Sequence, residues 1–353
     1  MSVRLTHLSH GGGCGCKLAP GVLAQLLADT PYARGLIAPA TAFPDLLVGI
    51  ETGDDAAVWR LSDTLAIVAT TDFFMPIVDD PYEFGRIAAT NAISDIYAMG
   101  ARPLFALALV AMPVDKLPPE VIRRILAGGE AAAQAAGIPI AGGHSIDAAE
   151  PIYGLAVIGV AHPGHIKRNR DAQAGDVLVL GKGLGVGIYS AALKKDALPP
   201  EAYAAMIATT TQLNSAGPEL AAIAGVHAMT DVTGFGLLGH ALEIARGSNL
   251  AAELEFARLP LLPQADRLAQ AGFVTGASGR NWASYGHEVE LFPGCADWQR
   301  ALLTDPQTSG GLLVACTPAV LDEVMQVMHR HGLARAAVVG RLLEGQARVE
   351  VQP

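Results

Sequence analysis

The residues most capable of chemistry lie in a short segment near the start of the chain, residues 10–17, which we call the strap. Two cysteines, Cys14 and Cys16, stand there beside Lys17, and most of the other residues are glycine. Glycine adopts positive φ at little cost, so the strap is expected to move. A nearby lysine lowers the pKa of a thiol, which favours a reactive thiolate. A frayed terminus is the ordinary alternative. A complete zinc site is excluded as an alternative, because the two cysteines of the strap supply too few ligands and the other two cysteines of the chain lack paired spacing.

Four aspartates form the second chemical feature, because each lies where a carboxylate needs a partner. Asp55, Asp72 and Asp231 follow apolar stretches that are typical of strands. Asp95 lies four residues after Asn91, on a helical face that is otherwise small and apolar. The ordinary explanation for the aspartates after strands is a solvated turn, and for Asn91 and Asp95 a solvent-exposed pair on a helix. The apolar surroundings favour a ligand site instead.

Carboxylates in this number suit Mg²⁺, a hard cation that takes oxygen ligands and commonly holds phosphate oxygens as well. No set of histidines or cysteines suggests zinc or iron. The residues therefore predict a metal-bound nucleoside triphosphate with a thiol on a movable strap above it. They leave the acceptor unnamed.

Two glycine-rich segments are weaker signals. Residues 142–147 read Gly-Gly-His-Ser-Ile-Asp and resemble a turn whose backbone amides cradle an anion, although ordinary hairpins use the same residues. Residues 181–187 superficially resemble a phosphate-binding loop, but the lysine comes too early and no Gly-Lys-Ser or Gly-Lys-Thr follows. We interpret this second segment as close packing of a helix on a strand.

The elements that must position these side chains alternate between strands and helices in both halves of the chain. Strands are expected at residues 46–50, 65–71, 103–112, 138–141, 152–160, 177–180, 250–256 and 312–316, and the main helices at 20–27, 82–99, 118–136, 200–225, 237–246 and 262–271. Strongly apolar strands of this kind predict a layered α+β or α/β fold. We expect the strap and its lead-in over 1–45, an N-terminal domain over 46–162, a linker, and a C-terminal α/β domain over 176–353.

Composition narrows the function classes. The chain has 353 residues, too many for one compact core. With 24 basic and 34 acidic residues its net charge is −10, which argues against nucleic acid or an anionic membrane as a partner. No apolar run is long enough to span a membrane and no signal peptide is evident. Four cysteines form no disulfide framework, so the cytoplasm is the expected compartment.

Seven stretches together resemble the selenophosphate synthetase (selenide, water dikinase) family. They are the strap and residues 52–58, 71–81, 89–95, 141–147, 229–236 and 305–311. The Cys-Gly-Cys-Lys of the strap separates this family from its relatives. The resemblance implies a two-domain ATP-binding fold like that of aminoimidazole ribonucleotide synthetase, and a homodimer formed through the N-terminal domains. It also implies that ATP, selenide and water give orthophosphate, AMP and selenophosphate, which supplies selenium for selenocysteine, selenouridine or both.

The resemblance also implies roles for individual residues. Cys14 and Lys17 match the catalytic positions, whereas Cys16 matches one that the family does not strictly require. The magnesium ligands are matched by Asp55, Asp95 and Asp231. The positions that contact ATP are matched by Lys17, Thr52, Gly53, Asp54, Asp72 and Asp95, and those that reach across from the partner subunit by Gly143, His144 and Ser145. Gly53 stands where a bacterial member carries arginine, so a backbone contact is expected there. A monovalent cation such as K⁺ is a further candidate cofactor.

Two other functions stay open beside selenophosphate synthesis. One is a different ATP-dependent enzyme of the same fold, such as a phosphoribosyl-amidine cyclase or a thiamine-phosphate kinase. That reading leaves Cys14 and Lys17 unexplained. The other is a selenium or metal carrier without catalytic activity, which has no use for four carboxylates spread over two domains. AMP formation from ATP and selenide separates the three.

Overall fold

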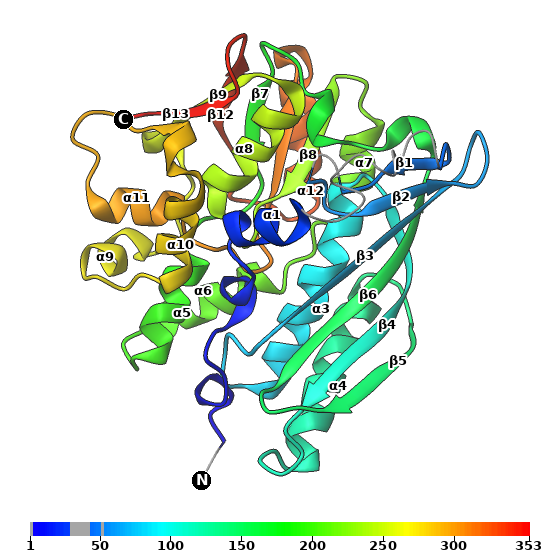
Figure 1. Cartoon of the computed structure of the whole chain (residues 1–353), viewed down its shortest axis with the longest axis vertical. Coiled ribbons are helices and arrows are strands. Elements are labelled where there is room, and N and C mark those ends of the chain that lie inside the picture. Colours follow the sequence, from blue (N-terminus) through cyan, green and yellow to red (C-terminus); the bar gives the residue numbers. More distant parts are fainter. Residues whose placement is uncertain (1–2, 29–42, 51–52) are drawn as a thin grey trace.

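The computed structural model describes residues 3–28, 43–50 and 53–353 of the chain. Within these ranges the chain forms two units, each built around one mixed sheet with helices packed on it (Figure 1). The layered α+β architecture predicted from alternating strands and helices is confirmed. Thr52, one of the predicted ATP contacts, lies outside the described residues, as does much of the lead-in before the first strand.

The first sheet has six strands in the order β1-β2-β3-β6-β4-β5. They are β1 (Leu46–Val48), β2 (Ala57–Arg60), β3 (Ala66–Phe74), β4 (Arg102–Met112), β5 (Ile140–Asp147) and β6 (Ile152–Ala161). β4 and β5 run parallel, and the other neighbouring strands are antiparallel. The helices α3 (Pro81–Ala98) and α4 (Pro119–Ala135) cover one face of this sheet, and the other face is open in the part of the chain shown in Figure 1.

The second sheet has seven strands in the order β10-β13-β9-β12-β7-β11-β8. They are β7 (Val177–Leu180), β8 (Val226–Asp231), β9 (Ala251–Glu255), β10 (Val289–Glu290), β11 (Leu312–Cys316), β12 (Ala337–Leu343) and β13 (Arg348–Gln352). The helices of this unit are α5 (Val186–Lys194), α6 (Pro200–Thr210), α7 (Gly217–Ala222), α8 (Gly236–Ser248), α9 (Ala265–Gln270), α10 (Gly276–Tyr285), α11 (Asp297–Leu303) and α12 (Leu321–Arg330). Alternate residues of β11 join two different cores, one with α8 and one with α12, so this sheet is covered on both faces.

Helix α3 lies between the two sheets and is buried over most of its length. It packs on β3 and β6 on one side and approaches β8 of the second sheet on the other. Asp80 caps its N-terminus by accepting a hydrogen bond from the N–H of Glu83 at 3.0 Å, and Gly100 follows its C-terminus with φ +74°. The helix predicted over residues 82–99 is therefore confirmed within one residue at each end. Because this helix is enclosed, its polar side chains need partners inside the protein.

The segment at residues 142–145 is part of the edge strand β5, so the predicted anion-cradling turn is wrong. Gly143, His144 and Ser145 pair with consecutive residues of β4. Gly143 has φ +151°, and a Cβ there would lie 2.1 Å from the carbonyl oxygen of Ala108. Glycine is needed at this position for close strand pairing rather than for a turn.

The strap lies between the two units and forms a short 3-10 helix over Gly13–Cys16. Gly13 has φ +53°, and its amide donates to the carbonyl of Met75 in the first unit at 2.9 Å. A Cβ on Gly13 would lie 2.2 Å from Thr308 Oγ1 in the second unit. After the strap, α1 (Pro20–Ala28) packs next to α10. The glycine therefore allows the strap to approach both units closely.

Residues 181–187 connect β7 to α5 and pack closely as predicted, although Gly187 at the start of the helix meets the loop at Asp305 rather than a strand. A Cβ on Gly187 would lie 2.4 Å from Asp305 Oδ1. The amides of Gly187 and Ile188 donate to Asp305 Oδ2 at 2.9 and 3.2 Å. The N-terminus of α5 is thus occupied by a side chain of the protein itself.

Candidate active site

Three aspartates converge where the two units meet, and we call them the carboxylate cluster. Asp55 precedes β2, Asp95 lies in α3, and Asp231 ends β8. One carboxylate oxygen from each lies within 4.8 Å of those of the other two. The structure therefore brings together the three predicted magnesium ligands, which come from both units.

Hydroxyl groups orient the cluster and leave one oxygen without a donor. Each carboxylate accepts a hydrogen bond from a hydroxyl: Asp55 from Thr230 (3.0 Å), Asp95 from Thr70 (2.6 Å) and Asp231 from Ser94. The second oxygen of Asp55, Oδ2, is buried and has no hydrogen-bond partner among the described residues. A buried carboxylate oxygen without a donor is costly unless a cation binds it.

Burial and mutual repulsion govern the ionisation of the cluster. Burial raises the pKa of Asp55 well above its ordinary value, and the charges of Asp231 and Asp95 raise it further. Burial likewise raises the pKa of Asp95, with added repulsion from Asp231 and Asp72. The pKa of Asp231 is also raised by burial, against a hydrogen bond from Ser94 that lowers it. A divalent cation would relieve this repulsion, and an all-oxygen donor set fits Mg²⁺.

Lys17 reaches the cluster from the strap. Its Nζ donates to Asp72 Oδ2 at 2.8 Å, and Asn91 Nδ2 donates to the same oxygen at 2.7 Å. Burial alone would lower the pKa of Lys17, but nearby acidic groups, Asp72 first among them, raise it well above its ordinary value. Lys17 is therefore a fixed positive charge beside the cluster.

The Cys14 thiol is enclosed at the centre of the site, with 1% of the residue exposed. Its Sγ donates to Asn91 Oδ1 at 3.2 Å, and its N–H donates to Thr308 Oγ1 at 2.9 Å. Burial raises the pKa of Cys14 by more than Lys17 lowers it. The predicted lysine-activated thiolate is wrong for this enclosed position, because a thiol removed from water stays neutral.

A cavity of about 200 Å³ lies beside the cluster, and we call it the carboxylate cavity. Its lining includes the predicted residues Lys17, Gly53, Asp54, Asp55, Asp72 and Asp95. Residues 143–145, in contrast, line a separate cavity near Tyr153. Within one chain, the structure therefore does not bring the predicted contacts from the partner subunit to the carboxylate cavity.

Gly53 and Asp54 also contact the linker between the units. The Gly53 carbonyl accepts a hydrogen bond from Asn169 Nδ2 at 3.3 Å, and Asp54 Oδ1 accepts one from the Asn169 N–H at 2.7 Å. Gly53 has φ +64°, a conformation that glycine adopts more easily than other residues. These contacts tie the linker to the edge of the site, a structural role that the sequence did not indicate.

Known protein families cover both units. Residues 53–161 match the family model "AIR synthase related protein, N-terminal domain", and residues 173–352 match "AIR synthase related protein, C-terminal domain". The selenide, water dikinase of Burkholderia pseudomallei (strain K96243) is 63% identical over 348 residues, which cover 99% of this chain and 96% of that protein. That of Rhizobium meliloti (strain 1021) is 58% identical over 351 residues, 99% of each chain. The chain belongs to the selenide, water dikinase family. The resemblance stated from the strap and the aspartate motifs is confirmed.

Solved structures outside the selenide, water dikinase family share the fold at low identity. Thiamine-monophosphate kinase from Stenotrophomonas maltophilia K279a matches with a TM-score of 0.64 and 22% identity, over 92% of this chain and 96% of that one. Hydrogenase maturation protein HypE in complex with ATP matches with a TM-score of 0.59 and 17% identity, over 99% and 94%. At these identities the likeness establishes the fold alone.

Sequence reasoning missed several side chains that contact the predicted ones or line the carboxylate cavity with them. They are Thr70, Ser94, Thr230, His240, Glu243 and Thr308. Three of them, Ser94, Thr230 and Thr308, lie inside stretches that resemble the selenide, water dikinase family, and those stretches could have pointed to them. Thr70 and the His240–Glu243 pair carry no local signal, because only the fold brings them to the site.

Proposed function

We propose that the carboxylate cluster, Lys17 and Cys14 carry out selenophosphate synthesis, the reaction of the family. ATP, selenide and water give selenophosphate, orthophosphate and AMP. The assignment of roles rests on one observation: three converging carboxylates meet the lysine and the thiol of the strap at one site. The fold alone does not distinguish this reaction from other ATP-dependent reactions, because the fold is shared with other proteins.

In this proposal the carboxylate cluster holds Mg²⁺ together with ATP. Bound there, Mg²⁺ would neutralise phosphate charge and align the transferred phosphoryl group. The threonine and serine hydroxyls fix the carboxylate oxygens, and Asp55 Oδ2 offers a position without a competing donor. Lys17 adds positive charge where two anions must approach each other. K⁺, the other cation suggested by the resemblance, has no comparable acidic cluster among the described residues.

Cys14 is proposed to act on the selenium acceptor rather than on the nucleotide. Asn91 Oδ1 accepts both the Cys14 thiol and the N–H of Ser309, at 3.2 and 2.7 Å, so the sulfur is oriented while the strap is closed. A closed strap excludes water from the acceptor position. Displacement of the strap would return the thiol to water beside Lys17 and lower its pKa.

Anaerobic incubation with Mg-ATP and selenide tests the proposed function. We expect AMP, orthophosphate and selenophosphate in equal amounts, with selenophosphate identified by phosphorus NMR. Release of ADP without AMP would instead favour a simple kinase of the same fold. Absence of nucleotide turnover would favour a carrier. Either result would contradict the proposal.

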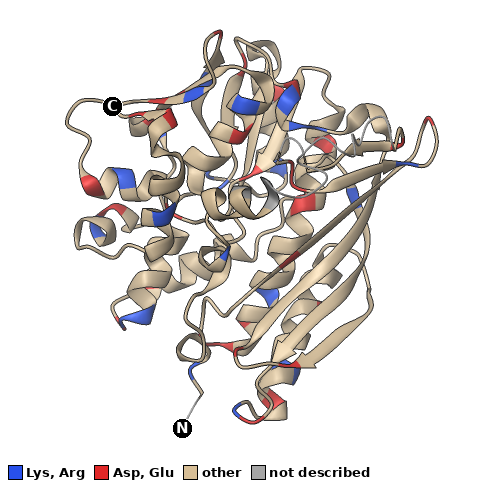
Figure 2. Ribbon diagram, in the orientation of Figure 1, with Lys and Arg blue, Asp and Glu red and all other residues tan. Residues whose placement is uncertain are grey.

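We also propose that the chain forms a homodimer through the open face and free edge of the first sheet. Phe73, Leu107 and Ile146 expose 51%, 38% and 56% of their surface there. Figure 2 shows few charged residues along these strands. Residues 141–147 of the edge strand β5 are exposed. Residues 143–145 would then be free to serve a neighbouring subunit, as the resemblance implies.

Light scattering tests this assembly. Ile146→Lys should produce a monomer with reduced activity, because it places a charge on the proposed apolar interface. Leu26→Lys, at a leucine on α1 that is 61% exposed, should leave the dimer intact. A parent chain that is monomeric and fully active at assay concentration would rule out the dimer.

The cytoplasm is proposed as the compartment. All four cysteines are free thiols, as expected in a reducing environment. Among the described residues, no helix combines the length and apolarity that crossing a membrane requires.

A further inference from the structure

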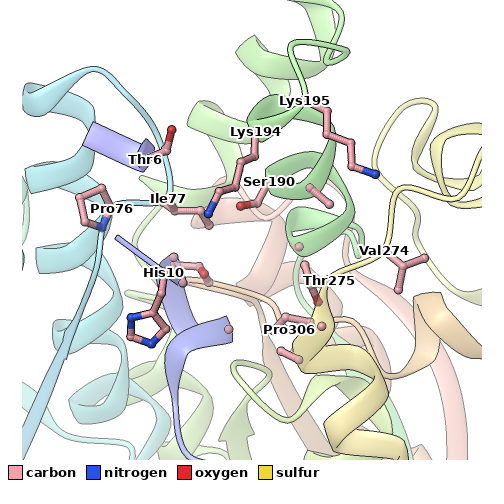
Figure 3. A pocket seen from close by; sticks show the side chains of 18 of the residues that line it. Thr6, His10, Pro76, Ile77, Ser190, Lys194, Lys195, Val274, Thr275 and Pro306 are labelled. Atoms are coloured by element: carbon pink, nitrogen blue, oxygen red, sulfur yellow. The ribbon is translucent and has the colours of Figure 1, made fainter. Parts of the chain in front are cut away.

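A second cavity uses the strap as part of its wall, and its charge is opposite to that of the carboxylate cavity (Figure 3). Its volume is about 310 Å³, and residues of the strap, α5 and α10 line it. The two linings have no residue in common. We call this space the basic cavity.

The basic cavity concentrates positive charge in an acidic protein. Its lining contains His10, Lys194, Lys195 and Arg280, and it contains no aspartate or glutamate. In Figure 3 the amine of Lys194 extends from α5 towards Ile77, while Lys195 points away towards Val274. With a net charge of −10 on the whole chain, this lining is a local exception that attracts anions.

The cations of this cavity are not neutralised by the described carboxylates. Lys194 Nζ donates to the carbonyl of Ser9, just before the strap, at 3.4 Å, and Arg280 Nη2 donates to that of Gly15 in the strap at 3.0 Å, so both contact neutral backbone groups. Lys195 Nζ lies 5.6 Å from the centre of the Phe273 ring. His10 differs, because Glu150 accepts from it at 2.9 Å. Three positive side chains are therefore available to an anion in solution.

The first turn of α10 adds to this charge. Gly276 and Ala277 belong to that turn and line the cavity. Thr275 caps the helix by accepting a hydrogen bond from the N–H of Ser278 at 3.2 Å. The remaining first-turn amides carry the partial positive charge of a helix N-terminus. The N-terminus of α5 differs, because Asp305 already occupies it.

The basic cavity also adjoins the backbone of Cys14. Thr308 lines it, and the same Thr308 hydroxyl accepts the N–H of Cys14. Gly12 and Gly15, on either side of Cys14, also line it, so no strap side chain separates the cavity from this part of the backbone. An anion held in the cavity would therefore be close to Cys14, and a small displacement of the glycine-rich strap would connect the two.

The carboxylate cavity is a poor entrance for an anionic acceptor. Its lining holds the carboxylates Asp54, Asp55, Asp72, Asp95 and Glu243 against the single cation Lys17. Hydrogen selenide is ionised to HSe⁻ in neutral water, so it is repelled there and attracted to the basic cavity. We propose that the basic cavity binds HSe⁻ and supplies it to Cys14, while Mg-ATP occupies the carboxylate cavity. This inference rests on the proposed function and adds the route by which the acceptor, HSe⁻, reaches Cys14.

Charge reversal at Lys194 tests the route. Lys194 is exposed, so its replacement should leave the fold intact. Lys194→Glu should raise KM for selenide on the order of tenfold, and Lys194→Gln by less, while kcat and KM for ATP stay at the parent values. Added KCl should raise KM for selenide steeply in the parent and only slightly in Lys194→Glu. The matched control is Lys116→Glu, at an exposed lysine that likewise donates to a backbone carbonyl, that of Ala149, at 3.3 Å.

The outcomes separate this inference from the proposed function. A parent enzyme that makes selenophosphate, with equal selenide KM in Lys194→Glu and Lys116→Glu, would overturn the route and leave the function intact. A change in KM for ATP that matches the change for selenide would also overturn it. A parent that makes no selenophosphate would contradict the proposed function, and the route would fall with it.

Discussion

The carboxylate cluster and the strap meet at one site, but the fold holds them in different ways. The cluster comes from just before β2, the last turn of α3 and the end of β8, and a hydroxyl donates to each carboxylate. The strap contains one short 3-10 helix, Gly13–Cys16, with glycine on both sides of Cys14. Its links to the two units include the Gly13 amide bound to Met75 in the first unit and the Cys14 amide bound to Thr308 in the second. This difference favours a division of roles in which the rigid cluster binds Mg-ATP and the strap can be displaced.

The two sides also differ in charge. The cluster contains more negative charge than the described residues balance, and burial raises the pKa of its carboxylates. The strap is balanced, because Lys17 pairs with Asp72 and Cys14 is a neutral thiol. In the proposed mechanism a cation would stabilise the cluster, whereas movement of the strap would activate Cys14. Variants should therefore separate metal-dependent steps from strap-dependent steps.

Breaking the cluster is expected to give the largest effect. Asp95→Asn keeps the size of the side chain and removes one negative ligand, so turnover at ordinary Mg²⁺ concentration should fall on the order of 10³-fold. Anaerobic AMP formation measures the loss, and circular dichroism checks that the protein is folded. Asp63→Asn, at an exposed residue in the turn between β2 and β3, is the matched control. Parent activity in Asp95→Asn would remove the cluster from the mechanism.

Stiffening the strap should cost less. Gly13→Val places a branched side chain at φ +53° and within 2.2 Å of Thr308 Oγ1, so the closed position of Cys14 should be lost. We expect turnover to fall roughly 10- to 100-fold with Mg-ATP affinity unchanged. Gly279→Ala is the control, because a Cβ there meets no atom within 4 Å. Equal loss of ATP affinity and turnover in Gly13→Val would show that the two sides are not separable.

The smallest effect concerns the resting reactivity of Cys14. Its raised pKa keeps the thiol neutral to higher pH than a free cysteine, so alkylation should accelerate little between about pH 7 and about pH 9. The half-buried Cys295 should react faster. Peptide mapping after iodoacetamide treatment measures both rates. Alkylation of Cys14 at the rate of a free thiol would contradict the enclosed resting position.

The cluster could be predicted from the sequence because its residues carry local signals. Asp55 lies between two apolar runs, Asp231 ends one, and Asp95 shares a helical face with Asn91. Each pattern is visible within a few residues, and the need of a buried carboxylate for a partner does not depend on the details of the fold. The same local regularity made α3 predictable.

The environment of Cys14 could not be predicted, because it depends on distant residues. Asn91 lies 77 residues from Cys14 along the chain, and Thr308 lies 294 residues away. Their contacts help to bury the thiol, and burial raises its pKa by more than Lys17 lowers it. The edge strand at residues 140–147 was missed for a similar reason, since pairing with β4 decides how its glycines are used.

Nucleotide binding and product formation measured on the same strap variants test the division of roles most directly. Cys14→Ala and Lys17→Ala should bind Mg-ATP in calorimetry with close to parent affinity, because the carboxylate cluster remains. Both should lose selenophosphate in phosphorus NMR by orders of magnitude. Cys16→Ala should keep substantial activity as the matched thiol control. If Cys14→Ala makes selenophosphate at the parent rate, the strap is not catalytic and the account is contradicted.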